Sequence, residues 1–274
     1  MMKLPDKNEI ELRIKNLPNL KLMQQANNQE TYSNPVYGEA QKRMKESRSH
    51  SEGSYFFELK STSPSPNYTI KNYSELINFY TEKLYKAENE IDIGFYLHQR
   101  GCVYFDTFQY ELSENDFKES LKYNPKNSML YYDLCDLCCI FKNYKEGLIY
   151  GNKSIEINPN FPTVYISLAA CYNALNLFDF ALMCCNESIK LDPYYIGGYY
   201  EIAFTYKHKL FDTETAFSYF TFAIDVSKLL PIIDDKMALS ISYRGRGSIY
   251  FERDQNELGL NDLELAISYD PGKI

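Results

Sequence analysis

Apolar residues recur at helical spacing through residues 94–273, in runs that are separated by short polar breaks. Three prolines mark where this pattern restarts, because Pro125, Pro159 and Pro193 are spaced 34 residues apart. Each of them follows an Asn or Asp at the end of an apolar run, and proline cannot continue a helix. The pattern therefore predicts a 34-residue repeat in which each unit is a pair of helices.

Placing each of these prolines at position 32 of a 34-residue frame defines the repeat windows. Pro271 closes the last window, and the fourth window carries one extra residue in its middle loop. The predicted repeats are residues 94–127, 128–161, 162–195, 196–230 and 240–273.

Small residues recur at two positions of this frame, where paired helices have to approach each other closely. Position 8 holds Gly101, Cys135, Ala169, Ala203 and Gly247, and position 27 holds Ser120, Ser154, Ser188, Ala223 and Ala266. A single helix pair cannot bury its own apolar face, so successive pairs have to stack. The sequence therefore predicts an all-α solenoid.

This pattern resembles the tetratricopeptide repeat family. The third window carries the resemblance best, through Tyr165, Leu168, Ala169, Tyr172, Ala181, Asp192 and Pro193. The family's Trp is replaced by Tyr or Leu at position 4 of every window. Gly147 and Gly151 replace the usual Ala and aromatic residue, which predicts looser packing in the second repeat. The resemblance implies a right-handed α-solenoid of about five helix-turn-helix repeats.

One further helix is predicted before the first repeat. Tyr73, Leu76, Tyr80 and Leu84 share one helical face, and Asn72 with Glu75 would form a capping box at its start. We expect this half-repeat helix to cover the open side of the first repeat. Residues 1–70 lack periodic apolar signal and end in a Ser- and Pro-rich linker, so we expect an irregular segment there and a solenoid over 71–274.

The composition limits the range of partners and locations. The chain has 37 acidic and 29 basic residues and a net charge of −8, which disfavours binding to nucleic acid or to anionic membranes. Apolar runs stay below the roughly 18 residues that a membrane-spanning helix needs. The charged N-terminal stretch does not read as a secretory signal, so we expect a cytoplasmic protein.

The chemistry-bearing residues do not predict a catalytic site. The P-loop, HExxH and nucleophile-elbow motifs are absent, and the three His are far apart in sequence. The seven Cys form an odd set, and Cys135, Cys138 and Cys185 stand where the repeat requires small or medium core residues. We therefore expect free thiols packed in the core, with metal or redox use as the less favoured alternative, and we predict no cofactor.

The resemblance also implies that the first helix of each repeat lines a concave groove through positions 2, 5, 9 and 12. The candidate partner-binding residues at these positions are Phe95, His98, Phe105, Met129, Tyr132, Asp136, Ile166, Asn173, Tyr200, Phe204, Lys207, Arg244 and Phe251. Such a groove would be aromatic and weakly charged, and burial of one ring against a partner stabilises by about 1.5–3 kcal/mol before ordering costs. The alternative is that some of these rings turn inward and pack between helices.

One specialised use of such a groove is not expected. Family members that bind chaperone tails clamp a terminal carboxylate with Lys, Asn and Arg. The matching positions here hold His98, Cys102 and Asp133, so the basic clamp is missing.

The last predicted helix has more apolar surface than one inward face uses, through Leu258, Leu260, Leu263, Leu265 and Ile267. A terminal repeat needs a polar outer face. We therefore predict that this edge is covered by the N-terminal segment, by a second copy in a homodimer, or by a partner. The alternative is that neighbouring Glu257, Asn261, Asp262 and Glu264 solvate it sufficiently.

The leading functional interpretation is a non-catalytic interaction module, an adaptor or chaperone-like scaffold that holds a partner polypeptide segment in its groove. A second interpretation is an acidic inhibitor or immunity protein that neutralises a basic toxin or enzyme, because its charge favours encounter with a cationic partner. A third is a sensor whose curvature is shifted by a short hydrophobic peptide.

Overall fold

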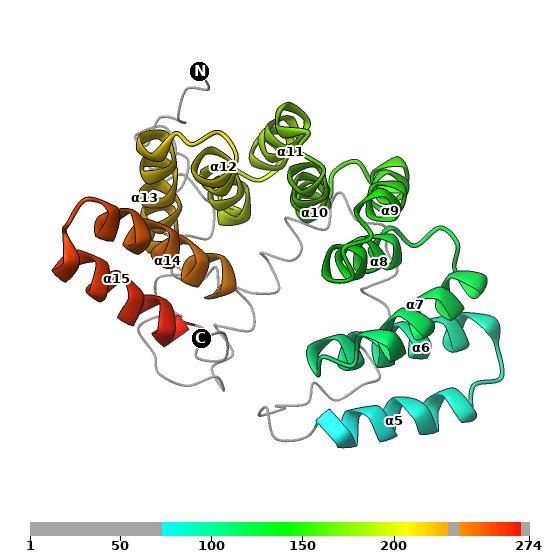
Figure 1. The fold of residues 1–274 in the computed structure, drawn as a ribbon. Coiled ribbons are helices and arrows are strands. Elements are labelled where there is room, and N and C mark those ends of the chain that lie inside the picture. Colours follow the sequence, from blue (N-terminus) through cyan, green and yellow to red (C-terminus); the bar gives the residue numbers. More distant parts are fainter. Residues whose placement is uncertain (1–72, 230–235, 270–274) are drawn as a thin grey trace. The chain divides into compact units, whose positions relative to one another are not determined.

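The computed structural model describes residues 73–229 and 236–269, and the regular structure in these ranges is helical (Figure 1). The helices are α5 (Tyr73–Tyr85), α6 (Glu90–Asp106), α7 (Tyr110–Tyr123), α8 (Ser128–Ile140), α9 (Tyr144–Ile157), α10 (Pro162–Ala174), α11 (Phe178–Leu191), α12 (Ile196–His208), α13 (Thr213–Leu229), α14 (Lys236–Glu252) and α15 (Asn256–Tyr269). Each predicted repeat window covers one pair of these helices, although α6 and α14 begin before their windows, at Glu90 and Lys236, and the all-α helical-repeat fold is confirmed. The predicted irregular segment, residues 1–70, lies outside the described residues.

The described helices belong to two compact units. The N-terminal unit contains α5 to α10, and the C-terminal unit contains α11 to α15. The division falls between Leu175 and Asn176, in the turn of the third repeat window. None of the helices in the described ranges combines the length and apolarity needed to cross a membrane.

Each unit has its own core. In the N-terminal unit, α6 packs on α7 and α8 on α9, while the half-repeat helix α5 lies against α6 as predicted. A cluster of fully buried side chains lies among these helices: Phe117, Leu130, Leu134 and Leu137. In the C-terminal unit, α12 packs on α13 and α14 on α15, around the fully buried Tyr199, Tyr219, Phe220, Ile224 and Ile249.

Paired helices touch at the small positions of the frame. At Gly101 of α6, a Cβ atom would come within 2.6 Å of the Phe117 ring on α7. The prediction of loose packing in the second repeat is wrong, because Gly147 and Gly151 are buried. A Cβ at Gly147 would lie 2.8 Å from Cys171 Sγ, and one at Gly151 would lie 2.6 Å from Leu168. These glycines allow close packing between α9 and its neighbours.

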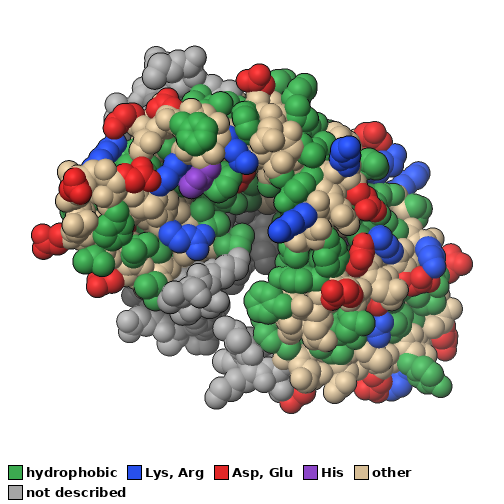
Figure 2. All heavy atoms as spheres, viewed as in Figure 1, with side chains coloured by type: hydrophobic (Ala, Val, Ile, Leu, Met, Phe, Trp, Pro, Cys, Tyr) green, Lys and Arg blue, Asp and Glu red, His purple; other side chains and the backbone are tan. Residues whose placement is uncertain are grey.

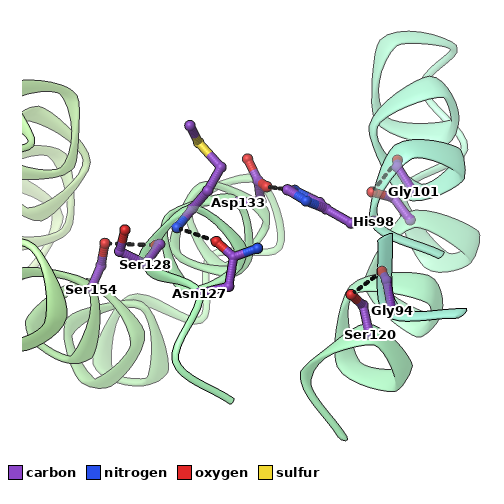
Figure 3. Close-up of polar contacts among 10 residues, drawn as sticks. Gly94, His98, Gly101, Ser120, Asn127, Ser128, Asp133 and Ser154 are labelled. Carbon is purple, nitrogen blue, oxygen red and sulfur yellow. Dashed lines mark hydrogen bonds and ion pairs between the residues drawn. The ribbon is translucent and has the colours of Figure 1, made fainter. Parts of the chain in front are cut away.

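Serines at these contacts form hydrogen bonds in addition to providing the small size that the frame predicts. Ser120 Oγ donates to the Gly94 carbonyl at 2.6 Å, and Ser154 Oγ donates to the Ser128 carbonyl at 2.8 Å (Figure 3). In both pairs, position 27 of the second helix is tied to position 1 of the first. Each bond satisfies a buried hydroxyl while it fixes the separation of the two helices.

The tyrosine that replaces the family's Trp links one repeat to the end of the previous one. The hydroxyl groups of Tyr131, Tyr165 and Tyr199 each donate to the carbonyl of the proline six residues earlier, at 3.2, 3.0 and 2.8 Å. Proline ends the preceding helix, and its carbonyl would otherwise need another donor. Tyr at position 4 therefore holds the turn between repeats.

We predict that Tyr199→Phe lowers the free energy of unfolding by about 1 kcal/mol, because the ring stays buried while the proline carbonyl loses a donor. Urea titration followed by circular dichroism measures this change. Tyr85→Phe is the matched control, since Tyr85 is 90% exposed, and should leave stability unchanged. Equal stability of both variants would contradict the role given to the hydroxyl.

The turns between paired helices share a left-handed residue that is never glycine. Phe108, Lys142, Asn176, Phe211 and Asp254 have φ between 56° and 61°. In the second repeat, Lys142 N–H donates to the Cys139 carbonyl and Asn143 N–H to the Cys138 carbonyl, at 3.2 and 2.8 Å. This bonding pattern is the Schellman motif, which normally places glycine at the left-handed position.

We predict that Lys142→Gly stabilises the chain by about 0.5–1 kcal/mol. A side chain in this conformation costs roughly 1–2 kcal/mol, and the greater freedom of unfolded glycine returns only part of that. Urea titration should show a higher midpoint for this variant. Lys153→Gly, at an exposed site inside α9, should instead lower it. A lower midpoint for Lys142→Gly would contradict the argument.

Candidate functional site

The N-terminal unit carries eight of the predicted groove residues on the first helices of its repeats. They are Phe95, His98 and Phe105 on α6, Met129, Tyr132 and Asp136 on α8, and Ile166 and Asn173 on α10. His98, Ile166 and Asn173 are buried, and the other five are half-buried. Figure 2 shows acidic and basic side chains interspersed with hydrophobic ones over the visible face of this unit.

Two of the predicted groove rings pack inward. Phe105 lies against the core cluster of α7 and α8, and its ring centroid is 5.6 Å from that of Tyr110. Tyr132 lies with its ring centroid 5.2 Å from that of Phe161. These contacts correspond to the alternative reading of the groove, in which some rings pack between helices.

The polar groups of this unit form a row between α6 and α8. His98 Nε2 lies 2.6 Å from Asp133 Oδ2, and Figure 3 shows the ring reaching from α6 to that carboxylate. The edge of the imidazole also contacts Phe117 at a centroid distance of 5.6 Å. Cys102 and Asp106 follow His98 at successive turns of α6, so all three lie on one face of that helix.

Negative charge is crowded in this row. Burial raises the pKa of the Cys102 thiol, and the charges of Asp133 and Asp106 raise it further. Asp106 is exposed as a residue, but partial desolvation of its carboxyl raises its pKa, with a smaller contribution from Asp133. Of the ion pairs within residues 73–229 and 236–269, Asp133 makes one with His98 and Asp106 makes none. The row therefore has an excess of potential anions over cations.

Asp136 on α8 makes the corresponding contact between the second and third repeats, because it faces Ser167 on α10. Ser167 on α10 donates a hydrogen bond to its carboxylate, and Tyr132 donates a second. Burial raises the pKa of Asp136 to about 7, although these two hydrogen bonds act in the opposite direction. The charges of Cys139 and Asp133 add to the increase.

This pKa predicts a pH dependence of stability. Between about pH 4 and 7 the folded chain keeps the Asp136 proton that the unfolded chain releases, so the free energy of unfolding falls as pH rises. Asp136→Asn should remove this loss and leave a flatter profile of melting temperature between pH 4 and 8. Asp179→Asn, at an exposed site on α11, is the control and should keep the wild-type slope. A wild-type slope in Asp136→Asn would contradict the prediction.

Three thiols of the N-terminal unit lie together. Cys139 Sγ is 3.2 Å from Cys171 Sγ, and Cys135 interacts with both of these thiols. All seven cysteines of the chain are free. Cys135, Cys138, Cys171 and Cys185 are buried. The thiols of Cys135, Cys139 and Cys171 fill the space between α8, α9 and α10.

The C-terminal unit carries the other five predicted groove residues. Tyr200, Phe204 and Lys207 lie on α12, and Arg244 and Phe251 lie on the neighbouring α14. Phe204 is 37% exposed and its ring lies 4.7 Å from that of His208. Arg244 is also exposed, while Tyr200 is half-buried. These residues give α12 and α14 an accessible surface that combines aromatic and cationic groups.

The remaining two residues are occupied within the unit. Lys207 Nζ bonds to the Ser248 hydroxyl and lies 2.9 Å from Glu252 Oε1, and its side chain is 7% exposed. The Phe251 ring lies over Gly259 of α15, where a Cβ atom would come within 2.8 Å of it. Both side chains therefore serve contacts between helices.

The predicted edge surface is apolar and partly exposed. Leu258 and Leu260 on α15 are 49% and 55% exposed, and Leu265 is half-buried. Polar neighbours on the same helix, including Glu257 and Asn261, are exposed as well. What covers this edge stays a prediction.

The sequence analysis did not predict which polar side chains form pairs across neighbouring helices. His98 and Asp133 are 35 residues apart, and Ser167 and Asp136 are 31 apart. Both separations are close to one repeat length, so the frame itself contained the signal. Arg100 with Asp116 and Arg246 with Asp262 were also missed, although each pair occupies positions 7 and 23 of its window. Each Arg makes two hydrogen bonds to its Asp, at 2.7–2.9 Å.

The paired helices, the small residues at their contacts and the stacked order define a helical-repeat protein. The family model of the tetratricopeptide repeat matches residues 96–127, within the first predicted window. Residues 96–127 therefore match a tetratricopeptide repeat, within a chain whose described part is a helical-repeat fold.

Solved structures of this class share the fold. TTC0263, a thermophilic tetratricopeptide repeat protein of Thermus thermophilus, is 16% identical, with a TM-score of 0.56 over 66% of this chain and 93% of that chain. The Cut9–Hcn1 hetero-tetramer of the APC/C gives a TM-score of 0.64 at 13% identity, over 74% of this chain and 38% of that chain. At these sequence identities, the two structures show that the fold is shared.

Proposed function

We propose that this chain is a protein–protein interaction scaffold that holds a partner polypeptide segment against the first helices of its repeats. The family and the fold support a scaffold role, because stacked helix pairs form extended surfaces for other chains. The finer assignment, a segment with apolar side chains, rests on the surface of α12 and α14.

The observation that carries this proposal is the exposed ring of Phe204. It stands one turn beyond Tyr200 on α12 and contacts His208. Large apolar rings that stay accessible beside polar groups are typical of sites where a partner residue anchors. Arg244 on α14 offers a cation that a carboxylate of the same partner would pair with.

A second argument for an apolar partner segment is that the polar residues at groove positions are already paired. His98, Asp136 and Lys207 are each bonded to another repeat within their own unit. A partner would have to break those bonds before it could use these groups. Phe204 is then the groove ring that is most accessible to a partner, because Phe105, Tyr132 and Phe251 pack against neighbouring helices.

We predict that Phe204→Ala lowers partner affinity by about 1.5–3 kcal/mol while the fold is retained, because 37% of the residue is already exposed. The partner is first isolated with the tagged full-length chain, and its affinity is then measured by calorimetry. Phe180→Ala is the matched control, since Phe180 is 52% exposed on the second helix α11. Unchanged affinity in Phe204→Ala would refute the assignment of this surface.

A further inference from the structure

We propose that His98, Cys102 and Asp133 form a binding site for a divalent transition-metal ion, zinc by its chemistry, between the first helices of the first two repeats. The nitrogen, sulfur and oxygen ligand atoms of these residues all lie within 4.8 Å of one another. The proposal goes beyond the scaffold function, because it involves the N-terminal unit and a different kind of ligand.

The fold positions all three ligands. His98 and Cys102 are four residues apart on α6, so they project from the same face of the helix. Asp133 reaches the same point from α8. The His98 ring is held by Phe117, and α6 is fixed to α7 by the Ser113 hydroxyl, which donates to the Gly101 carbonyl at 2.9 Å. The two α6 ligands therefore stand on a rigid element.

The donor set selects the metal. Imidazole, thiolate and carboxylate together suit zinc, whereas calcium and magnesium prefer oxygen ligands alone. Zinc binds these donors at about 2.0–2.3 Å, and a site with three protein ligands keeps a fourth position for water or another group. Asp106, one further turn along α6, lies on the same helical face as His98 and Cys102 and is a candidate for that position.

The surrounding charge favours a cation. Asp133 and Asp106 are both close to Cys102, and His98 is the only ion-pair partner that either carboxylate has among the described residues. A divalent ion at His98 Nε2 would leave the single imidazole proton on Nδ1, and it would take the place of the Cys102 thiol proton, which would pass to solvent. The two positive charges of the ion would offset most of the negative charge of the Cys102 thiolate, Asp133 and Asp106.

The bound ion would join the first two repeats of the N-terminal unit. In the metal-free chain, the hydrogen bond of 2.6 Å between His98 and Asp133 makes this link. Coordination would add Cys102 to it and hold α6 and α8 more firmly. The chain should therefore be more stable with the metal, since an ion that binds only the folded state raises the free energy of unfolding.

The test is a titration of the metal-free full-length chain under reducing conditions that do not chelate metal. Calorimetry with Zn²⁺ should show about one ion per chain, and Zn²⁺ should raise the melting temperature. Co²⁺ should give the visible absorption of a four-coordinate site together with a thiolate-to-cobalt charge-transfer band. Absence of stoichiometric binding of either ion to the wild-type chain would overturn the proposal.

Variants locate the ion. Cys102→Ser should abolish the charge-transfer band and weaken binding at least tenfold. Asp133→Asn should weaken it similarly, with a side chain of the same shape. Cys139→Ser is the matched control, because Cys139 is a half-buried thiol of the neighbouring cluster, and it should bind like the wild type. Loss of binding in Cys139→Ser with retention in Cys102→Ser would assign the metal to the other thiols and overturn the site.

These outcomes are independent of the scaffold function. Phe204→Ala lies in the other unit and should bind zinc normally, whereas Cys102→Ser should keep the surface of α12 and α14. Loss of partner binding and loss of metal binding are therefore separately observable.

Discussion

The close contact between paired helices, as between α6 and α7 or α14 and α15, is the constraint on which the structure of each unit depends. Where a Cβ atom at Gly101 would lie 2.6 Å from Phe117, the two backbones are closer than ordinary side chains allow. Serine hydroxyls across the same contacts bond to backbone carbonyls and so fix the separation. The paired helices then present one combined apolar face, and that face can be buried only by the next pair.

The 34-residue frame made much of this fold predictable. Proline spacing located the helix pairs, because proline ends a helix wherever it occurs in the frame. The left-handed turns were not predictable in the same way. Phe108, Lys142 and Asp254 occupy a conformation that favours glycine, and the hydrogen bonds of the turn, not the residue type, maintain it there. At position 4 the residue type itself matters. Tyr stands where the family has Trp, and the hydroxyl of Tyr165 donates a hydrogen bond to the carbonyl of Pro159.

The candidate site was less predictable because helical spacing fixes the face of a residue but not the depth of its side chain. Phe105 and Phe204 both stand at groove positions of first helices. The Phe105 ring packs on the core cluster, whereas Phe204 remains 37% exposed. The difference depends on the neighbouring helix: Tyr110 of α7 lies beside Phe105, whereas the ring beside Phe204 is His208 of its own helix. Phe105 also packs on the core cluster, which includes Leu130 and Leu134 of α8, and the frame aligns contacts between residues so distant in sequence only approximately.

The polar residues of the first helices have a shared role that changes what a partner meets. His98 with Asp133, and Ser167 with Asp136, connect successive first helices of the N-terminal unit. Lys207 with Ser248 does the same between α12 and α14. When such a pair is broken, a buried group that is left without a partner costs about 1–3 kcal/mol. Within each unit, these polar groups therefore hold successive first helices together. Under the proposed function, a partner chain would meet the exposed Phe204 ring and Arg244 instead of these paired groups.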